Sequence, residues 1–345
     1  MLSDVDVKER LGADRVIEPA GFLPQPAARL DASGPVRPFE FEVAIERLCL
    51  DATSFRDIRA RADGDPGRMA ALIEQIVTDR GKMHNPETDS GGIALGVVTE
   101  VGDRFENPPR PGDRIATLAS LTLTPLRLDR VVRVDPDSAM VDVDGIAYVA
   151  STAPWGPMPD DLPEKIAVEV YDVYGAASQT LRLAKPGDTV CVMGCGHAGK
   201  LAMAAAKTVV GELGRVVGVD VDERAVARVR DLGLCDVGVA TDLRDPLRAL
   251  DDLATAGVTG ADLTIVVVSA RGCEPAAIVA TKSGGTVLFF SMATSFQTAA
   301  LTADGMGHDI TMLVGSGYTP DTGAIALELV RSTPALLAAF QESSS

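Results

Sequence analysis

The sequence predicts an α/β protein in which a β-rich domain precedes a domain built on a doubly wound parallel sheet. In the second half, short apolar runs alternate with helical stretches, which is typical of parallel strands covered on both faces. These predicted strands are 189–193, 215–220, 263–268, 286–290 and 311–314. The first half has strand-like runs at 39–50 and 93–101, many glycine and proline turns, and one short helix predicted at 66–78. This pattern favours a barrel-like or partly open antiparallel sheet.

Length and charge exclude several classes of protein. The 345 residues correspond to roughly two domains at about 150 residues each. The net charge is −17 and there is no basic block, so we expect neither a nucleic-acid partner nor a membrane partner. The charged start of the chain predicts no secretion signal. The five cysteines include no C-x-x-C pair, which predicts a reducing cytoplasm rather than a disulfide framework.

A glycine-rich turn follows the predicted strand 189–193 and opens a helix of small residues. It reads Gly194-Cys195-Gly196-His197-Ala198-Gly199. In a G-x-G-x-x-G turn, the first glycine permits the tight bend, the second lets the main chain approach a pyrophosphate, and the third lets helix and strand pack closely. The helix amino terminus offers unpaired N–H groups to the phosphates. The turn predicts dinucleotide binding, with Cys195 and His197 as loop positions rather than catalytic groups.

An acidic residue ends the next predicted strand. Asp220 lies 26 positions after Gly194 (220 − 194) and can accept hydrogen bonds from the adenosine ribose, which favours NAD over NADP. Arg224 is near enough to accommodate a 2′-phosphate, so NADP stays possible. The remaining predicted cofactor-binding residues are Val221, Val268 and Ser291.

The order of the two domains resembles the medium-chain dehydrogenase/reductase superfamily. The matching segments are SGGIALGVVTEVG (90–102), PGDRIATL (111–118), KPGDTVCVMGCGHAG (185–199) and VGSGYTPDTGAIALELV (314–330). The resemblance implies a Rossmann domain at 161–315 and a GroES-like catalytic domain at 1–160, to which residues 316–345 return. It also implies a homodimer or higher homo-oligomer joined through the edges of the nucleotide-domain sheets, with the run from 263–268 to 286–290 contributing.

The zinc-dependent members of this superfamily carry metal ligands that the present sequence lacks. The corresponding stretches read Asp51-Ala52-Thr53-Ser54 and Gly91-Gly92-Ile93, with a third position near Glu169. Thr53, Gly92 and Glu169 do not form a tetrahedral zinc set, because zinc takes thiolate or imidazole ligands with at most one carboxylate in such sites. We therefore expect no metal.

Three further segments resemble a narrower family, the L-erythro-3,5-diaminohexanoate dehydrogenases. They are RVIEPAGFLPQPAARLD (15–31), LCLDATSFRDI (48–58) and GKMHNPETDSGG (81–92). The resemblance implies oxidative deamination of (3S,5S)-3,5-diaminohexanoate at C3 to 5-amino-3-oxohexanoate, with NAD(P) reduced and ammonium released. The implied partner is thus a small diamino acid.

Amine oxidation requires a base, because an ammonium must lose a proton before hydride can leave the adjacent carbon. In the 81–92 loop, His84 suits proton transfer at neutral pH. Lys82 could pair with the substrate carboxylate, and Glu87 or Asp89 could hold the second ammonium. The resemblance places a second pair of candidate acids, Glu169 and Asp172, on a helix facing the nicotinamide. The other predicted substrate-binding residues are Asn85, Ser90, Thr53, Ser54 and Tyr148.

Two other functions fit the same architecture. One is a zinc-free quinone or enone reductase, which would not need the cluster of acids and bases at 82–89. The other is a protein that binds a nucleotide without catalysis. Fold alone does not distinguish these functions.

Overall fold

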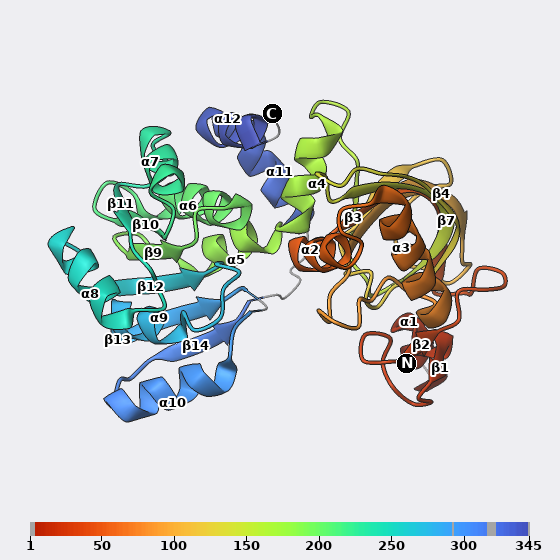
Figure 1. Ribbon diagram of the computed structural model, residues 1–345, viewed down its shortest axis with the longest axis horizontal. Helices are drawn as coiled ribbons and strands as arrows, with labels where there is room; N and C mark the ends of the chain where they lie inside the picture. Colours follow the sequence, from red (N-terminus) through yellow and green to blue (C-terminus); the bar gives the residue numbers. More distant parts are fainter. Residues whose placement is uncertain (1–3, 292, 316–321, 344–345) are drawn as a thin grey trace. The chain divides into compact units, whose positions relative to one another are not determined.

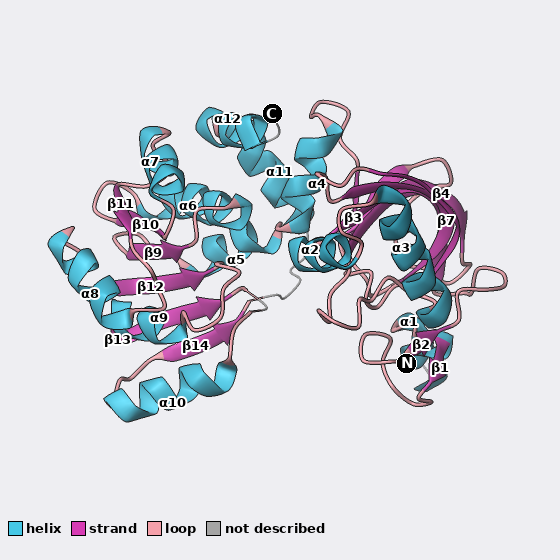
Figure 2. Ribbon diagram, in the orientation of Figure 1, coloured by secondary structure: helices cyan, strands magenta, loops and turns pink. Residues whose placement is uncertain are grey.

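The chain forms two compact units, Met1–Glu164 and Lys165–Ser345 (Figure 1). The structure is a computed structural model that describes residues 4–291, 293–315 and 322–343. Figure 2 shows that strands dominate the first unit, whereas helices and strands alternate in the second. This is the β-rich domain followed by an α/β domain that the sequence predicts.

The first unit is built on an antiparallel sheet of six strands in the order β6-β7-β3-β4-β5-β8. Its elements are α1 (Asp4–Arg10), β1 (Val16–Glu18), β2 (Arg29–Leu30), β3 (Glu40–Leu50), α2 (Ala52–Arg61), α3 (Pro66–Arg80), β4 (Gly92–Val101), β5 (Arg114–Thr117), β6 (Leu126–Val134), β7 (Met140–Ala150) and β8 (Trp155–Pro157), with a 3₁₀ turn at Ala13–Arg15. The predicted strands at 39–50 and 93–101 are β3 and β4.

Helix α3 covers this sheet, and local signals fix both of its ends. The Asp65 side chain accepts from Arg68 N at 2.8 Å, Pro66 occupies the first turn, and Gly81 ends the helix at φ +63°. These are an N-cap, a tolerated proline and a left-handed C-cap. Met69 and Ile73 on α3 are buried in the same core as strand residues of β3 and β4, which leaves the loop after Gly81 at the edge of the packed sheet.

The second unit has a parallel sheet in the order β11-β10-β9-β12-β13-β14. Counted from β9, this is the 3-2-1-4-5-6 order of a doubly wound dinucleotide-binding fold, with its switch point between β9 and β12. The strands are β9 (Thr189–Met193), β10 (Arg215–Asp220), β11 (Val237–Ala240), β12 (Ala261–Val266), β13 (Thr281–Phe289) and β14 (Thr311–Val314). The helices are α4 (Glu164–Asp172), α5 (Gly175–Leu183), α6 (His197–Val210), α7 (Glu223–Asp231), α8 (Pro246–Thr255), α9 (Glu274–Ala280), α10 (Phe296–Met306), α11 (Thr322–Ser332) and α12 (Pro334–Ser343).

The prediction that residues 263–268 and 286–290 form the edge of this sheet is wrong. The expectation joined subunits through 263–268 and 286–290, yet β12 pairs with both β9 and β13, and β13 pairs with both β12 and β14. The hydrogen-bonding groups of β12 and β13 are therefore engaged on both sides. Among the described strands, β14 ends the sheet on that side, and its Val314 is 63% exposed.

The last two helices contact the second unit. Helix α11 contacts α5 and α6, and α12 contacts α6. Lys200 Nζ donates to Ala339 O at 3.2 Å, and the Phe340 ring lies 4.9 Å from the His197 ring. The resemblance implied that residues 316–345 return to the first domain, whereas α11 and α12 pack on the small-residue face of α6 and belong to the second compact unit. Residues 316–321 lie outside the described part of the chain.

Two further observations concern membrane-spanning helices and disulfide bonds. Within the described residues, no single helix is long and apolar enough to cross a membrane, although α11 and part of α12 would reach that length and composition as a pair bent by 98°. All five cysteines are buried and free of disulfide bonds.

Candidate functional site

The loop between α3 and β4 places a histidine against a carboxylate. His84 Nε2 lies 2.5 Å from Asp89 Oδ1, and the histidine is 5% exposed while the Asp89 side chain is 81% exposed. Asp89 N donates to Asn85 O, and Asn85 N donates to Ser90 O, both at 2.9 Å. Asp89 takes a left-handed backbone at φ +54°, which aspartate tolerates better than most residues. The loop thus joins a buried imidazole to an exposed acid.

This contact fixes which nitrogen of His84 carries the proton. An ionised carboxylate can only accept, so Nε2–H donates to Asp89. Nδ1 is buried and has no hydrogen-bond partner among the described residues. Burial is the main cause that lowers the pKa of His84, and it outweighs the opposing effect of Asp89. At neutral pH the imidazole is therefore neutral, with a bare lone pair on Nδ1, and can act as a base.

A second part of the site lies where β3 ends and α2 begins; it includes the predicted Thr53, Ser54 and Ser90 together with two residues that the sequence did not point to, Asp51 and Thr88. Asp51 Oδ1 accepts from Thr53 N and Ser54 N, both at 2.9 Å, and from Ser90 Oγ at 3.0 Å. Thr88 joins this group, because its hydroxyl lies 2.8 Å from Ser90 Oγ and 3.2 Å from Ser54 Oγ. Asp51 is the N-cap of α2, a helix that was not predicted from the sequence, although an aspartate before a helix is a recognisable N-cap signal. The hydrogen bond that Asp51 accepts from Ser90, 39 residues later, could not be predicted from the sequence.

Other predicted members of this group have varied surroundings. Ser54 is fully buried and its hydroxyl lies 2.8 Å from Ser90 Oγ, whereas Thr53 is exposed. Asn85 is buried and donates to Asp57 Oδ2 at 2.9 Å. Glu87 is exposed. The structure thus brings Ser54 and Ser90 together, pairs Asp89 with His84, and leaves Glu87 exposed.

The position of Lys82 does not suit the predicted contact with a substrate carboxylate. Its side chain is fully buried, and Nζ donates to the main-chain oxygens of Pro24 and Gln25, both at 2.8 Å. Burial and the charge of Arg80 lower the pKa of Lys82 to about 8. The ammonium ties the 24–25 segment to this loop, so its hydrogens are engaged within the protein.

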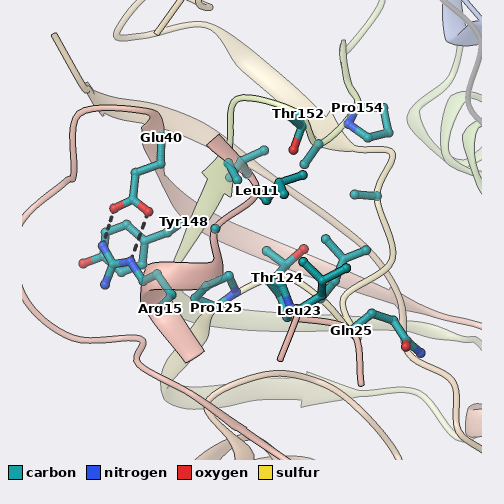
Figure 3. A pocket seen from close by; sticks show the side chains of 17 residues that line it. Leu11, Arg15, Leu23, Gln25, Glu40, Thr124, Pro125, Tyr148, Thr152 and Pro154 are labelled. Atoms are coloured by element: carbon teal, nitrogen blue, oxygen red, sulfur yellow. Dashed lines mark hydrogen bonds and ion pairs between the residues drawn. The ribbon is translucent and has the colours of Figure 1, made fainter. Parts of the chain in front are cut away.

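Tyr148 lines a separate cavity of about 220 Å³ in the first unit (Figure 3). Its hydroxyl donates to Gly34 O at 2.7 Å, and the Arg15 guanidinium lies 3.8 Å from its ring centroid. Arg15 also pairs with the buried Glu40, and Thr124 donates to Ser120 O. These polar groups are already satisfied, so the cavity does not match a zwitterionic ligand and Tyr148 does not suit the predicted role in substrate binding.

In the second unit, the glycine turn has the geometry of a pyrophosphate cradle. A Cβ on Gly199 would lie 1.9 Å from Gly194 O, so strand and helix meet here only without a side chain. A Cβ on Gly196 would meet nothing within 4 Å, which leaves open space at the amino terminus of α6. Val268 follows β12 and lies beside the turn, since its N is 3.0 Å from the position of a Cβ on Gly194. These residues fit a dinucleotide.

The acid predicted to bind ribose occupies the carboxyl end of β10. Asp220 Oδ2 accepts from Cys195 N at 2.7 Å, and Oδ1 accepts from Asp222 N at 3.1 Å. Val221 and Arg224 are exposed beside it. Ser291 is half-buried after β13, at the same edge of the sheet. The carboxyl ends of parallel strands thus collect the predicted cofactor-binding residues at one edge.

His197 and Glu169 lie near each other without forming an ion pair. His197 Nε2 lies 3.9 Å from Glu169 Oε2, and burial together with Lys200 and Lys165 lowers the pKa of His197 to about 4. His197 is therefore neutral at physiological pH. Asp172 is exposed on α4. Burial raises the pKa of the Cys195 thiol, which accords with a packed turn position rather than a nucleophile.

Where the resemblance places a zinc-binding histidine, the backbone requires glycine. Gly92 has φ +123°, and a Cβ there would lie 2.0 Å from Cys49 O. Among the described residues, no group of three His, Cys, Asp or Glu side chains gathers in a metal-binding arrangement.

The fold and the cofactor turn define a two-domain dehydrogenase/reductase of the medium-chain type. The quinone oxidoreductase from Coxiella burnetii shares this fold, with a TM-score of 0.56, 15% identity, and coverage of 90% of this chain and 89% of that chain. A family model described as the L-erythro-3,5-diaminohexanoate dehydrogenase N-terminal domain matches residues 14–159. Two L-erythro-3,5-diaminohexanoate dehydrogenases, from Acetoanaerobium sticklandii and Fusobacterium nucleatum, are 37% and 38% identical over 96% of this chain and 98% of each relative. The chain belongs to this family, which confirms the predicted fold class and the narrower resemblance.

Two glycine variants should separate packing from cofactor binding. Gly199→Ala forces a Cβ against Gly194 O and should lower the free energy of unfolding by about 1–3 kcal/mol. Gly196→Ala meets no protein atom and should change stability by less than about 0.5 kcal/mol, yet weaken NADH binding at least about tenfold by filling the space for the pyrophosphate. Thermal unfolding and NADH fluorescence titration measure the two effects. Unchanged NADH affinity in Gly196→Ala would contradict the assignment of the turn.

Proposed function

We propose that this protein oxidatively deaminates (3S,5S)-3,5-diaminohexanoate at C3 to 5-amino-3-oxohexanoate and ammonium, a reaction of lysine fermentation, with NAD as the preferred acceptor. The similarity to two L-erythro-3,5-diaminohexanoate dehydrogenases over nearly the whole chain carries the choice of substrate. Asp220 supports NAD over NADP, because its carboxylate would repel a 2′-phosphate. The five cysteines are buried and none forms a disulfide bond, which supports a reducing location such as the cytoplasm.

The first chemical task is to make the C3 amine neutral. His84 Nδ1 is the best-placed base, since its lone pair is bare and Nε2 is held by Asp89. When Nδ1 takes the ammonium proton, the adjacent carboxylate stabilises the imidazolium. Bound NAD supplies the acceptor for the two electrons that leave C3 with its hydrogen. The glycine turn and Asp220 would hold that cofactor.

The second task is hydrolysis of the resulting iminium. Water adds to C3, and both of its protons are transferred to the nitrogen, so that the C–N bond breaks to give the ketone and ammonium. His84 can serve again once its proton has left, and the exposed Asp89 provides a route from the buried ring to solvent. One base and one exposed carboxylate thus suffice for both proton transfers. We propose Glu169 and Asp172 as further candidates for stabilising positive charge.

The substrate is tested with purified protein. NADH absorbance should rise on addition of 3,5-diaminohexanoate and NAD, with one ammonium released per NADH. The rate with NADP should be lower than that with NAD. Failure to turn over this diamino acid, together with NADPH-dependent reduction of a quinone or enone, would assign the protein to the alternative reductase class. NAD binding without turnover of any amine would favour a non-catalytic nucleotide-binding role.

The base is tested by substitution and by pH. His84→Gln should lower kcat about 10²–10⁴-fold while NAD affinity stays unchanged, and His308→Gln, on the other unit, provides the matched control. Because the pKa of His84 lies below its ordinary value, wild-type kcat/KM should fall only as the pH drops below about 6.5. Asp89 raises that pKa, so Asp89→Asn should move the acid limb to still lower pH. An acid limb that does not move would contradict the pairing.

We also propose a homodimer that uses the edge of the parallel sheet. Strand β14 is the edge strand among the described residues, and Met312 and Val314 expose apolar surface on it. Pairing of two such edges would extend the sheet and cover both side chains. Light scattering should give twice the 36.0 kDa chain mass, and Val314→Lys should shift the mass toward the monomer. A monomeric wild type, or dimers unaffected by Val314→Lys, would overturn this arrangement.

A further inference from the structure

The two carboxylate oxygens of Asp51 have opposite surroundings. Oδ1 accepts three hydrogen bonds, from Thr53 N, Ser54 N and Ser90 Oγ. Oδ2 is buried and has no hydrogen-bond partner among the described residues. The three donors fix the plane of the carboxylate, so Oδ2 cannot turn toward them without losing those bonds. Oδ2 of Asp51 is therefore a buried, oriented oxygen with no hydrogen-bond donor among the described residues.

Such an oxygen is costly unless a donor arrives. A buried acceptor without a partner destabilises the folded protein, and more so when it carries charge. The neighbouring Ser90 hydroxyl already donates to Oδ1. The missing donor must then come from outside the protein, and a cationic N–H group offers the strongest bond.

His84 Nδ1 is a second buried acceptor without a partner among the described residues, and the same loop holds both. Asp89 binds the His84 ring, and the next residue, Ser90, binds Asp51. The two acceptors without a hydrogen-bond donor, His84 Nδ1 and Asp51 Oδ2, therefore differ in basicity. The two amino groups of the proposed substrate also differ, because the one at C3 is removed by oxidation and the one at C5 is retained.

We propose that Asp51 Oδ2 binds the C5 ammonium and makes the site selective for a 3,5-diamino acid over a 3-monoamino acid. The inference rests on the proposed function. A carboxylate is a far weaker base than an alkylamine, so an amine paired with Asp51 stays protonated. The C3 ammonium must lose a proton, so we place it at His84. The C5 ammonium stays protonated, so we place it at Asp51. This replaces the expectation that Glu87 or Asp89 holds the second ammonium, because Glu87 is exposed and Asp89 binds His84.

The test compares two substrates in two proteins. The substrates are 3,5-diaminohexanoate and 3-aminohexanoate, which differ only in the C5 amino group. The wild type should favour the diamino acid at least about 100-fold in kcat/KM, as expected for a charge-paired hydrogen bond. Asp51→Asn keeps an N-cap acceptor but loses the charge. It should lower kcat/KM for the diamino acid about 100-fold and for the monoamine less than threefold.

Asp65→Asn is the matched control. Asp65 caps α3 by accepting from Arg68 N, as Asp51 caps α2, but it lies on an exposed part of the chain. This variant should leave the ratio of the two kcat/KM values unchanged. Thermal unfolding of both variants reports any shared loss of helix capping.

The outcomes distinguish this inference from the proposed function. A wild type inactive with 3,5-diaminohexanoate would overturn both. An active wild type that uses both substrates equally would overturn the inference alone, even if Asp51→Asn failed to fold. If kcat/KM falls equally for both substrates in folded Asp51→Asn, Asp51 acts on the reacting amine or in packing, and the inference is overturned. If kcat/KM falls for neither substrate, Asp51 has no role in binding, and the inference is likewise overturned.

Discussion

Oδ1 of Asp51 holds the candidate site together, because it accepts from two different parts of the chain. Two of its donors are main-chain N–H groups at the start of α2, and the third is the Ser90 hydroxyl in the 81–92 loop. The first two satisfy orphan donors of the helix. The third fixes the loop to the end of β3. The position of His84, the proposed base, therefore depends on a capping interaction formed more than thirty residues earlier in the chain.

The same strand end explains why a metal ligand is missing. Leu50 and Gly92 are paired across β3 and β4, and the positive φ of Gly92 brings its Cα against Cys49 O. Any side chain at this position would force the strands apart. The sequence has instead an aspartate at the end of β3. Negative charge suits amine oxidation, because the intermediate that forms at C3 is a cation, which a metal ion would disfavour.

The sequence was most informative where one local rule determines the structure. The glycine turn, Asp220 and the apolar strands follow from backbone geometry and burial, so their positions could be predicted within a few residues. Helix α2 was missed because ATSFRDIRAR has mainly exposed positions and buries only Ser54 and Ile58. The edge of the parallel sheet was misplaced because strand order is a tertiary property. The roles of Asp51 and Thr88 likewise depend on contacts between segments that are distant in sequence.

Lys82 lies in the predicted loop, but its contacts do not suit the role that its residue type suggested. Its residue type suggested a salt bridge to substrate, yet its three hydrogens face the interior and two reach main-chain oxygens. Burial is the largest cause that lowers the pKa of His84, and the positive charge of Lys82 acts in the same direction. With a pKa of about 8, Lys82 is mostly charged at neutral pH and helps to keep the imidazole neutral. Asp89 opposes both effects and prevents the base from becoming too weak. The proton affinity of His84 therefore results first from its burial, and then from the opposing effects of Asp89, which raises it, and of Lys82, which lowers it.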